Sequence, residues 1–204
     1  MIIEIQPNSI DKRLIKQAID VLKSGGIIVF PTDTVYAMGC DLYNKKALMK
    51  LAKLKDIKLS KANFSIICPD LSHLSEYVKQ IDRSTFKLLK HNLPGPFTFI
   101  LSATNEVQRL FESNRKEIGI RIPNNNIILE LTSVLGNPIA TTSLHNDHDE
   151  LLDYFVDPYA IYEQMDDQVD LIIDGGIGKL EASTIVDCTS GEPNVVRQGA
   201  GHLS

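Results

Sequence analysis

Short apolar segments of strand length recur along this chain, and several are separated by segments with helical periodicity. Gly26–Phe30, for example, is wholly apolar and ends at Pro31, which predicts a central strand covered on both faces. Alternation of such strands with helices predicts an α/β fold. Because several strands follow one another without an intervening helix, we expect a twisted mixed sheet with helices on its faces, rather than a regular doubly wound sheet.

The expected elements follow from apolar periodicity and from capping residues. The first helix lies within 9–25, with Asn8 or Ser9 as its N-cap and Gly25 as its C-terminal stop. The other expected helices cover 45–55, 71–82, 83–93 and 127–135. The expected strands cover 2–5, 26–30, 63–68, 94–103, 118–122, 137–143, 170–176, 183–189 and 194–200.

Bulk composition sets limits on the function. The chain has 204 residues and a formal net charge of -5, which disfavours a globally basic nucleic-acid binder but allows a local basic groove. No apolar run approaches the length of a membrane span, and the N-terminus shows no signal-peptide pattern, so we expect a cytoplasmic protein. The three cysteines show no CxxC or zinc spacing, and we expect them to be reduced and buried.

Polar side chains follow four of the expected strands. Hydroxyls and Asp33 follow Phe30, Arg121 precedes Pro123, hydroxyls occupy 141–143, and the run 174–176 reads Asp-Gly-Gly. Ligands of open α/β sheets bind beyond strand ends, so this repeated enrichment predicts a ligand site. In any one segment, the same residues would also serve simply to end strands and cap helices.

A second feature is a block of seven lysines with a single acid, Asp56, in an otherwise acidic chain. Lysine is a mobile point charge suited to phosphate, so the block suggests a site for a triphosphate or an RNA backbone. A solvated helix face is the alternative. Lys55 to Lys61 are better ligand candidates, because they lie on the loop that returns to the sheet. The lysines are Lys45, Lys46, Lys50, Lys53, Lys55, Lys58 and Lys61.

Several common signatures are missing from the sequence. It has no GxxxxGK[ST], GxGxxG, HExxH or GxSxG motif, so it is not a P-loop protein, and no metal site is expected. His145 and His148 lie in a strongly acidic stretch, 143–168, that we expect to form a surface helix and loop.

Taken in order, the motifs resemble those of one family. The segments follow one another in this order: "GGIIVFPTDTVYAMGCD", the lysine-rich segment, "NFSIIC", "LPGPFTFIL", "IGIRIP", "IATTSLH", "DLIIDGG", "STIVDCT" and "VVRQGA". The match covers roughly Ser9 to Ala200. This pattern resembles the YrdC-like family, the threonylcarbamoyl-adenylate synthases of tRNA modification, and most closely its YciO branch. The resemblance implies one domain over 9–200, a YrdC-like α/β fold with a large, concave, positively lined groove.

The resemblance also implies an activity. Members of the family combine ATP, bicarbonate and L-threonine into threonylcarbamoyl-AMP and pyrophosphate, for the N6-threonylcarbamoyl modification of adenosine 37 in tRNA. No covalent nucleophile is needed. Mg²⁺ is expected to be bound to the nucleotide, and the implied partners are tRNA and proteins of the same modification pathway.

Site residues carry over motif by motif. Thr32, Arg121 and Thr141 are implied to bind L-threonine, with Arg121 on the carboxylate. Lys55 is implied to be a catalytic phosphate ligand, with Lys58 as a possible substitute for a missing arginine. The implied nucleotide-binding residues are Lys55, Asn63, Ser143, Ser183 and Arg197.

Three positions depart from the family pattern. The Lys-x-Arg motif reads Lys55-Asp56-Ile57, the Ser-x-Asn motif reads Ser143-Leu144-His145, and a histidine of the threonine pocket corresponds to Cys68. These departures leave two alternatives open: a noncatalytic protein of the same fold that binds a nucleotide, double-stranded RNA or tRNA, and another small-molecule transferase.

Overall fold

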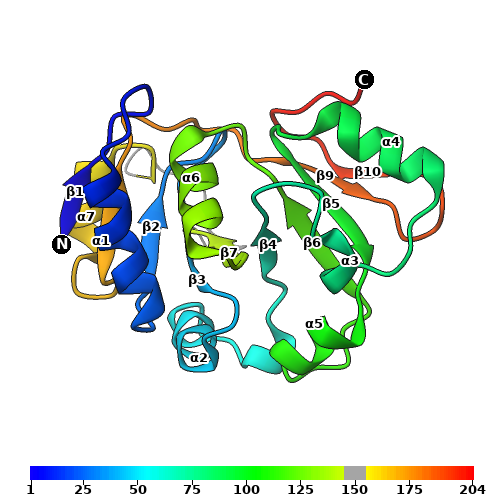
Figure 1. Cartoon of the computed structure of the whole chain (residues 1–204), viewed down its shortest axis with the longest axis horizontal. Coiled ribbons are helices and arrows are strands. Elements are labelled where there is room, and N and C mark those ends of the chain that lie inside the picture. The colour runs from blue at the N-terminus through cyan, green and yellow to red at the C-terminus, as the bar shows by residue number, and fades with distance from the viewer. Residues whose placement is uncertain (145–154) are drawn as a thin grey trace.

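A computed structural model describes residues 1–144 and 155–204. Within these residues a ten-stranded sheet runs through the molecule (Figure 1), with the strand order β1-β8-β2-β3-β7-β4-β6-β5-β9-β10. Parallel pairing joins β1 to β8, β8 to β2, β4 to β6 and β5 to β9, and the other neighbours are antiparallel. The expected mixed α/β sheet is therefore confirmed.

The strands are short. They are β1 (Ile2–Glu4), β2 (Ile28–Phe30), β3 (Ala37–Asp41), β4 (Ser65–Ile67), β5 (Phe97–Ser102), β6 (Glu117–Arg121), β7 (Ile139–Ser143), β8 (Leu171–Asp174), β9 (Thr184–Asp187) and β10 (Asn194–Arg197). The β2 strand is fully buried between β8 and β3, as its apolar sequence predicts. No strand was expected at β3, because its glycine and its aspartate weaken the strand pattern.

The helices are α1 (Lys12–Lys23), α2 (Lys45–Leu54), α3 (Leu74–Tyr77), α4 (Arg83–Asn92), α5 (Asn105–Leu110), α6 (Asn126–Leu135) and α7 (Pro158–Met165), with a 3₁₀ turn, η1, at Leu59–Lys61. None of these helices is long and apolar enough to cross a membrane.

Three helix predictions need correction. The N-cap of α1 is Asp11, whose carboxylate accepts a hydrogen bond from the Arg13 amide, rather than Asn8 or Ser9. Only one turn of the helix expected over 71–82 forms, as α3, and α5 lies in a segment expected to be a loop. Gly25 does end α1, because it takes a left-handed φ of 87° directly after the C-cap. Within the acidic stretch, α7 forms, while the predictions for 145–154 lie outside the described residues.

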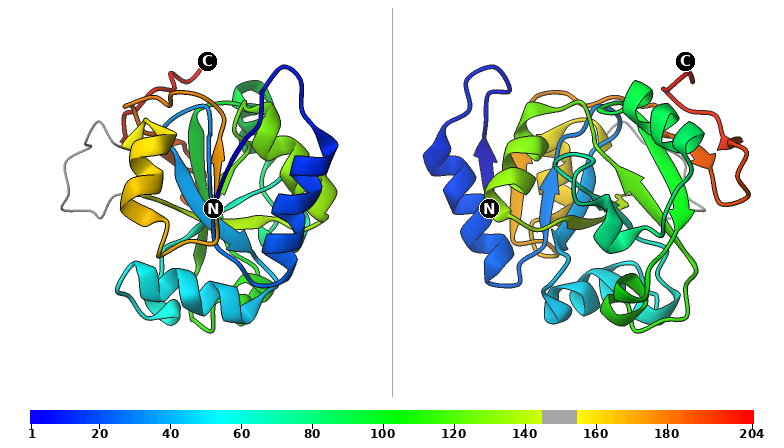
Figure 2. Two further views of the ribbon diagram at one scale, coloured as in Figure 1. Left: turned by 90° about the vertical axis from the view of Figure 1, so that its left-hand side faces the viewer. Right: turned by 45° about the vertical axis from the view of Figure 1, so that its right-hand side comes forward.

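Helices cover the two faces of the sheet unequally. The apolar sides of α1 and α6 pack with residues of β1, β2 and β8 into one core cluster. Residues of α2, α3, α4, α5 and α7 join a larger cluster on the other face. Figure 2 shows α1 and α6 on one side of the sheet and α7 on the opposite side.

The α1–α6 layer stops partway across its face of the sheet. Ala37, Ile67 and Ile139 lie on that face at the edge of the layer, within its core cluster. Beyond them the same face carries several hydroxyls, among them Thr141 of β7 and Ser65 of β4, which pair with each other. A sheet face left uncovered by helices can remain polar, and the candidate site lies there.

Candidate functional site

A cavity of about 190 Å³ opens over the uncovered part of the sheet. Its walls come from β3, β7, β4, β5, β6, β9 and β10 and from the segments beside them. The lining residues are Thr34, Val35, Ala37, Asn63, Ser65, Thr98, Arg121, Thr141, Thr142, Ser143, Ala182, Ser183, Ile185 and Arg197. Seven hydroxyl side chains and two guanidinium groups converge there from strands that are distant in sequence.

Strand register explains why these side chains share one face. Ser65 pairs with Thr141, and Ala37 pairs with Ser143, so the four lie on the same face of β4, β7 and β3. Residues two apart on a strand point to the same side, which places Thr141 and Ser143 together. Across the sheet, Thr98 of β5 pairs with Ile185 of β9, and both line the cavity.

Arg121 is the buried charge of the site. It ends β6 with only 7% of its surface exposed, and its Nη2 donates a hydrogen bond of 3.0 Å to Thr34 Oγ1. Burial lowers the pKa of Arg121, while the nearby Asp33 carboxylate acts in the opposite direction. An arginine at a cavity of this size is suited to a carboxylate, which it can bind through two parallel hydrogen bonds.

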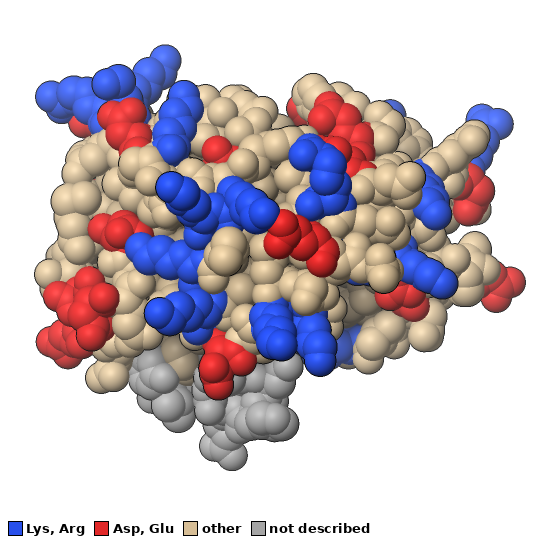
Figure 3. All heavy atoms as spheres, turned by 90° about the horizontal axis from the view of Figure 1, so that it is seen from below, with Lys and Arg blue, Asp and Glu red and all other residues tan. Residues whose placement is uncertain are grey.

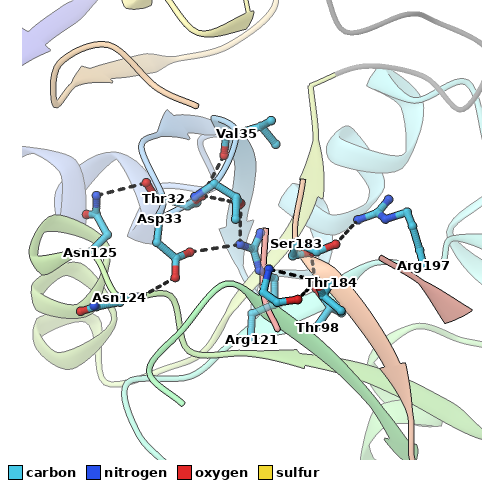
Figure 4. Close-up of polar contacts among 12 residues, drawn as sticks. Thr32, Asp33, Val35, Thr98, Arg121, Asn124, Asn125, Ser183, Thr184 and Arg197 are labelled. Carbon is cyan, nitrogen blue, oxygen red and sulfur yellow. Dashed lines mark hydrogen bonds and ion pairs between the residues drawn. The ribbon is translucent and has the colours of Figure 1, made fainter. Parts of the chain in front are cut away.

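The turn after β2 holds this arginine through hydroxyls (Figure 4). Thr32 is buried and does not line the cavity, but it contacts Thr34, which does. Thr32 Oγ1 is 3.0 Å from Thr34 Oγ1 and 2.8 Å from the Val35 carbonyl oxygen. Asp33 accepts a 2.9 Å hydrogen bond from the Asn124 amide, which ties this turn to the segment after β6. Thr34, rather than Thr32, lines the cavity.

The opposite wall is held by the C-terminal strands. Ser183 Oγ lies 2.8 Å from Thr98 Oγ1, and Arg197 Nη2 donates a 2.8 Å hydrogen bond to the Ser183 carbonyl oxygen. Thr184 stabilises this wall through three hydrogen bonds. Its Oγ1 accepts hydrogen bonds from the backbone amides of Gly199 and Gly201 and donates one to the Gly201 carbonyl oxygen. Arg197 is thereby directed toward the cavity from a strand whose residues are all exposed.

The lysines divide into two groups. Lys55 is the C-cap of α2, and its Nζ donates a 3.3 Å hydrogen bond to the carbonyl oxygen of Ser143, which lines the cavity. Lys58 is exposed and lies in a separate shallow hollow with Asp56 and Ile57. Lys45 pairs with Glu112, and the Nζ of Lys50 lies 2.6 Å from Asp170. Figure 3 views the molecule from below relative to Figure 1 and shows basic side chains gathered on this face, interspersed with acidic ones.

The structure thus brings six of the predicted site residues to one cavity: Asn63, Arg121, Thr141, Ser143, Ser183 and Arg197. Lys55 reaches its rim and Thr32 lies behind it. The Asp-Gly-Gly run after β8 is elsewhere, since Gly175 and Gly176 bond the hydroxyl of Tyr36. The site is also on the face of the sheet, rather than beyond the strand ends.

Sequence reasoning missed the lining residues Ser65 and Thr98, whereas Thr34 is one of the hydroxyls after Phe30 that were expected at a ligand site. Ser65 and Thr98 each have an apolar residue on either side, and these hydroxyls within apolar surroundings were the available signal. Arg115 was missed as well. It donates hydrogen bonds to the carbonyl oxygens of Ala62 and Phe64 and so fixes the segment that carries Asn63. Burial lowers the pKa of Arg115 to about 10.

The three cysteines are free and buried, as expected. Cys68 follows β4, and burial raises the pKa of its thiol to about 12. The described residues contain no group of three or more His, Cys, Asp or Glu side chains placed to hold a metal ion.

The fold is a mixed α/β sheet, and its hydroxyl-lined cavity surrounds a buried arginine, a chemistry that suits a small anionic ligand. The model of the family described as "Telomere recombination" (Sua5, YciO and YrdC) matches residues 20–199. The chain therefore belongs to the Sua5/YciO/YrdC family, which confirms the resemblance inferred from the motifs.

Individual relatives match over nearly the whole chain. An uncharacterized protein of Haemophilus influenzae is 42% identical over 198 residues, which are 97% of this chain and 94% of that protein. The uncharacterized protein YciO of Escherichia coli is 41% identical over 200 residues, 98% of this chain and 95% of that protein.

Solved structures of family members have the same fold. The crystal structure of E. coli YciO superimposes with a TM-score of 0.88 at 40% identity and covers 99% of this chain and 97% of that one. Sua5 of P. abyssi, complexed with L-threonine, gives a TM-score of 0.86 at 25% identity over 98% of this chain and 57% of the Sua5 chain.

Proposed function

We propose that this protein is a threonylcarbamoyl-AMP synthase-like nucleotidyltransferase, which forms threonylcarbamoyl-AMP and pyrophosphate from L-threonine, bicarbonate and ATP for tRNA modification. The observation that carries the proposal is the buried Arg121 in a hydroxyl-lined cavity of about 190 Å³. Pockets for drug-sized ligands begin at roughly 300 Å³, so this cavity suits a smaller carboxylate. The related Sua5 structure, complexed with L-threonine, supports an amino acid as that ligand.

The reaction requires positioning and charge rather than a covalent nucleophile. The threonine amine and bicarbonate condense to a carbamate with release of water, and a carbamate oxygen then attacks the α-phosphorus of ATP and expels pyrophosphate. Arg121 would hold the threonine carboxylate, and Lys55 and Arg197 would offset the charge that develops on the phosphates. Asn63, Ser143 and Ser183 would hold the adenylate. Mg²⁺ would arrive bound to the phosphates of the substrate.

The test is pyrophosphate release by the purified protein. With ATP, bicarbonate and L-threonine together, we expect release that depends on all three substrates and falls to background when L-threonine is omitted. An Arg121→Gln variant should raise the concentration of L-threonine needed for half-maximal release. Release that is equal with and without L-threonine would contradict the proposal.

One observation favours a second candidate, a noncatalytic protein that binds double-stranded RNA or tRNA. Ile57 occupies the position of the family's motif arginine, and this residue is 39% exposed beside a lysine-rich surface. Binding through phosphates releases counterions, so affinity for RNA would fall steeply with salt. Salt-sensitive RNA binding, combined with no threonine-dependent pyrophosphate release, would favour this candidate over the synthase.

A further inference from the structure

Arg115 connects the start of β6 to the segment that leads into β4. It lies two residues before β6, and its guanidinium donates to three carbonyl oxygens: Nη1 to Ala62 at 3.3 Å, Nη2 to Phe64 at 3.1 Å and Nε to Glu117 at 2.9 Å. Within the described part of the chain it forms no ion pair with a carboxylate. Its donors are used on the backbone instead.

The carbonyl groups of Ala62 and Phe64 receive these hydrogen bonds where the sheet has not yet begun. Pairing of β4 with β7 starts at Ser65, and pairing of β4 with β6 starts at Ile66. Ala62 is nevertheless extended, with φ -71° and ψ 125°. Carbonyl groups two residues apart in an extended segment point to the same side, so one planar guanidinium can bind both. Arg115 thus takes the place of a neighbouring strand.

These two contacts determine which way Asn63 points. The side chains of Ala62 and Phe64 are buried in the larger core cluster. Because successive side chains of an extended segment point to opposite faces, Asn63 is directed to the other face, where it lines the cavity together with Ser65. The position of Asn63 at the cavity therefore depends on Arg115, which does not itself line the cavity.

The arginine is in turn held by α5 and the residue that follows it. The guanidinium carbon lies 4.7 Å from the centre of the Phe111 ring, which packs edge-to-face on Phe64. Gln108 of α5 donates a 3.0 Å hydrogen bond to the Arg115 carbonyl oxygen. Lysine cannot replace this group, because an ammonium is a point charge without the planar fork that binds two carbonyl groups while it stacks on a ring.

We infer that Arg115 is a positioning residue for the nucleotide, because it holds Asn63 where the Asn63 amide can bind the adenylate. This inference rests on the proposed function, in which Asn63 holds the adenylate. It also divides the site into two separately supported halves. Arg121, at the other end of β6, is held by Thr34 and Asp33 of the turn after β2, so binding of L-threonine does not depend on Arg115.

Hydrogen exchange of the full-length protein without ligand tests the backbone contacts by themselves. Arg115→Lys should speed exchange of the amides of 62–64 by about tenfold, the range of one hydrogen bond, and leave β5 unchanged. Arg109→Lys, at an exposed arginine of α5 that pairs with Glu106, is the matched control and should leave both regions unchanged. Exchange over 62–64 that is unchanged in Arg115→Lys, or that rises equally in β5, overturns the inference.

Calorimetric titration with Mg–ATP tests the link to the nucleotide. Asn63→Ala should weaken ATP binding by about tenfold, and Arg115→Lys should weaken it by a similar or smaller factor. If Arg115 acts through Asn63, then Arg115→Lys adds less than about twofold in the Asn63→Ala background. Losses that multiply in the double variant overturn the inference. Binding of L-threonine should be unchanged in all of these variants, and an equal loss for both ligands in Arg115→Lys also overturns it.

A milder variant covers the case in which Arg115→Lys does not fold. Gln108→Ala removes the hydrogen bond to the Arg115 carbonyl oxygen at a partly buried position and should give the same pattern with smaller changes. The proposed function and the inference can fail separately. Wild type that does not bind ATP overturns the proposed function, and the role toward the nucleotide with it. ATP binding that Asn63→Ala weakens and Arg115→Lys leaves unchanged overturns the inference alone.

Discussion

The guanidinium of Arg121 and the carboxylate of Asp33 lie against each other inside the protein, with 3.6 Å between Nη2 and Oδ1. The two side chains are only 9% and 8% exposed. Among the described residues, neither Arg121 Nε nor Asp33 Oδ1 has a hydrogen-bond partner. The pair is therefore held by charge and by its surroundings, and Asp33 is the counter-charge for the arginine of the cavity.

Asp33→Asn should strongly destabilise the fold. The amide oxygen can still accept from the Asn124 amide, but the buried charge of Arg121 loses its partner, which typically costs about 3–5 kcal/mol. The measurement is the free energy of unfolding from urea denaturation. In the double variant Asp33→Asn with Arg121→Gln, the loss should be smaller than the sum of the two single losses. Strictly additive losses would contradict direct pairing.

Gly119→Ala should damage the floor of the cavity. A Cβ at Gly119 of β6 would lie 2.4 Å from Ser65 Oγ and 3.1 Å from Thr98 Cγ2, and both residues line the cavity. Such overpacking costs typically 1–3 kcal/mol, and here it also shifts two hydroxyls of the site. We expect lower stability in urea and weaker L-threonine binding. Ser65→Ala in the Gly119→Ala background should recover the lost stability, and no recovery would argue against this clash.

The sheet was predictable because its strands carry a strong local signal. Gly26–Phe30 and 63–68 are apolar runs bounded by turn residues, and both contain strands in the structure. β3 was not predictable in the same way, since Ala37–Asp41 includes a glycine and an aspartate. Its burial between β2 and β7 is a tertiary effect that overrides local propensity.

The site was predictable in part, for a related reason. Arg121, Ser143 and Ser183 belong to motifs that the chain shares with its family, so their convergence could be expected before the structure. Thr34 and Thr98 lie inside the motif segments "GGIIVFPTDTVYAMGCD" and "LPGPFTFIL", but the resemblance assigned no individual role to either. They lie at the cavity because of cross-strand register and because the α1–α6 layer ends before this part of the sheet, and neither property can be read from local sequence.

Asp56→Gly should stabilise the protein. Asp56 follows the C-cap of α2 with a left-handed φ of 52°, while the Ile57 amide donates back to the Ala52 carbonyl oxygen at 3.0 Å. This position strongly favours glycine, and the exchange should add up to about 1 kcal/mol to the free energy of unfolding. Asp56→Ala keeps the unfavourable φ and serves as the control in the same urea titration. Equal free energies of unfolding for Asp56→Gly and Asp56→Ala would show that the left-handed φ at this position costs no stability.

Alkaline pH should lower the stability through the buried thiols. Burial raises the pKa of Cys68 to about 12 and of Cys188 to about 11, from an ordinary value of 9.0. Well below pH 9 both thiols are protonated in the folded and in the unfolded protein, so their contribution to the free energy of unfolding is constant. From pH 9 to about 11 the unfolded chain ionises first, so the free energy of unfolding falls by at most about 1.4 kcal/mol per pH unit for each thiol.

The control for this pH dependence is Cys68→Ala. Other groups titrate in the same window, but only the difference in slope between wild type and the variant reports on Cys68. The variant should lose stability less steeply above pH 9, even if removal of the sulfur lowers its stability at neutral pH. Parallel curves from pH 8 to 11 would mean that the thiol ionises equally in both states.

Lys55→Ala should reduce threonine-dependent pyrophosphate release by about 100-fold or more while leaving the fold intact. Its Nζ reaches the cavity rim at the Ser143 carbonyl oxygen, where it can offset charge on the phosphates of ATP. Lys55→Arg keeps the charge and should retain part of the activity. Lys46→Ala, on an exposed position of the same helix, is the matched control and should match wild type. Product formation at the wild-type rate by Lys55→Ala would rule out a catalytic role, because a cation needed in the transition state cannot be removed without cost.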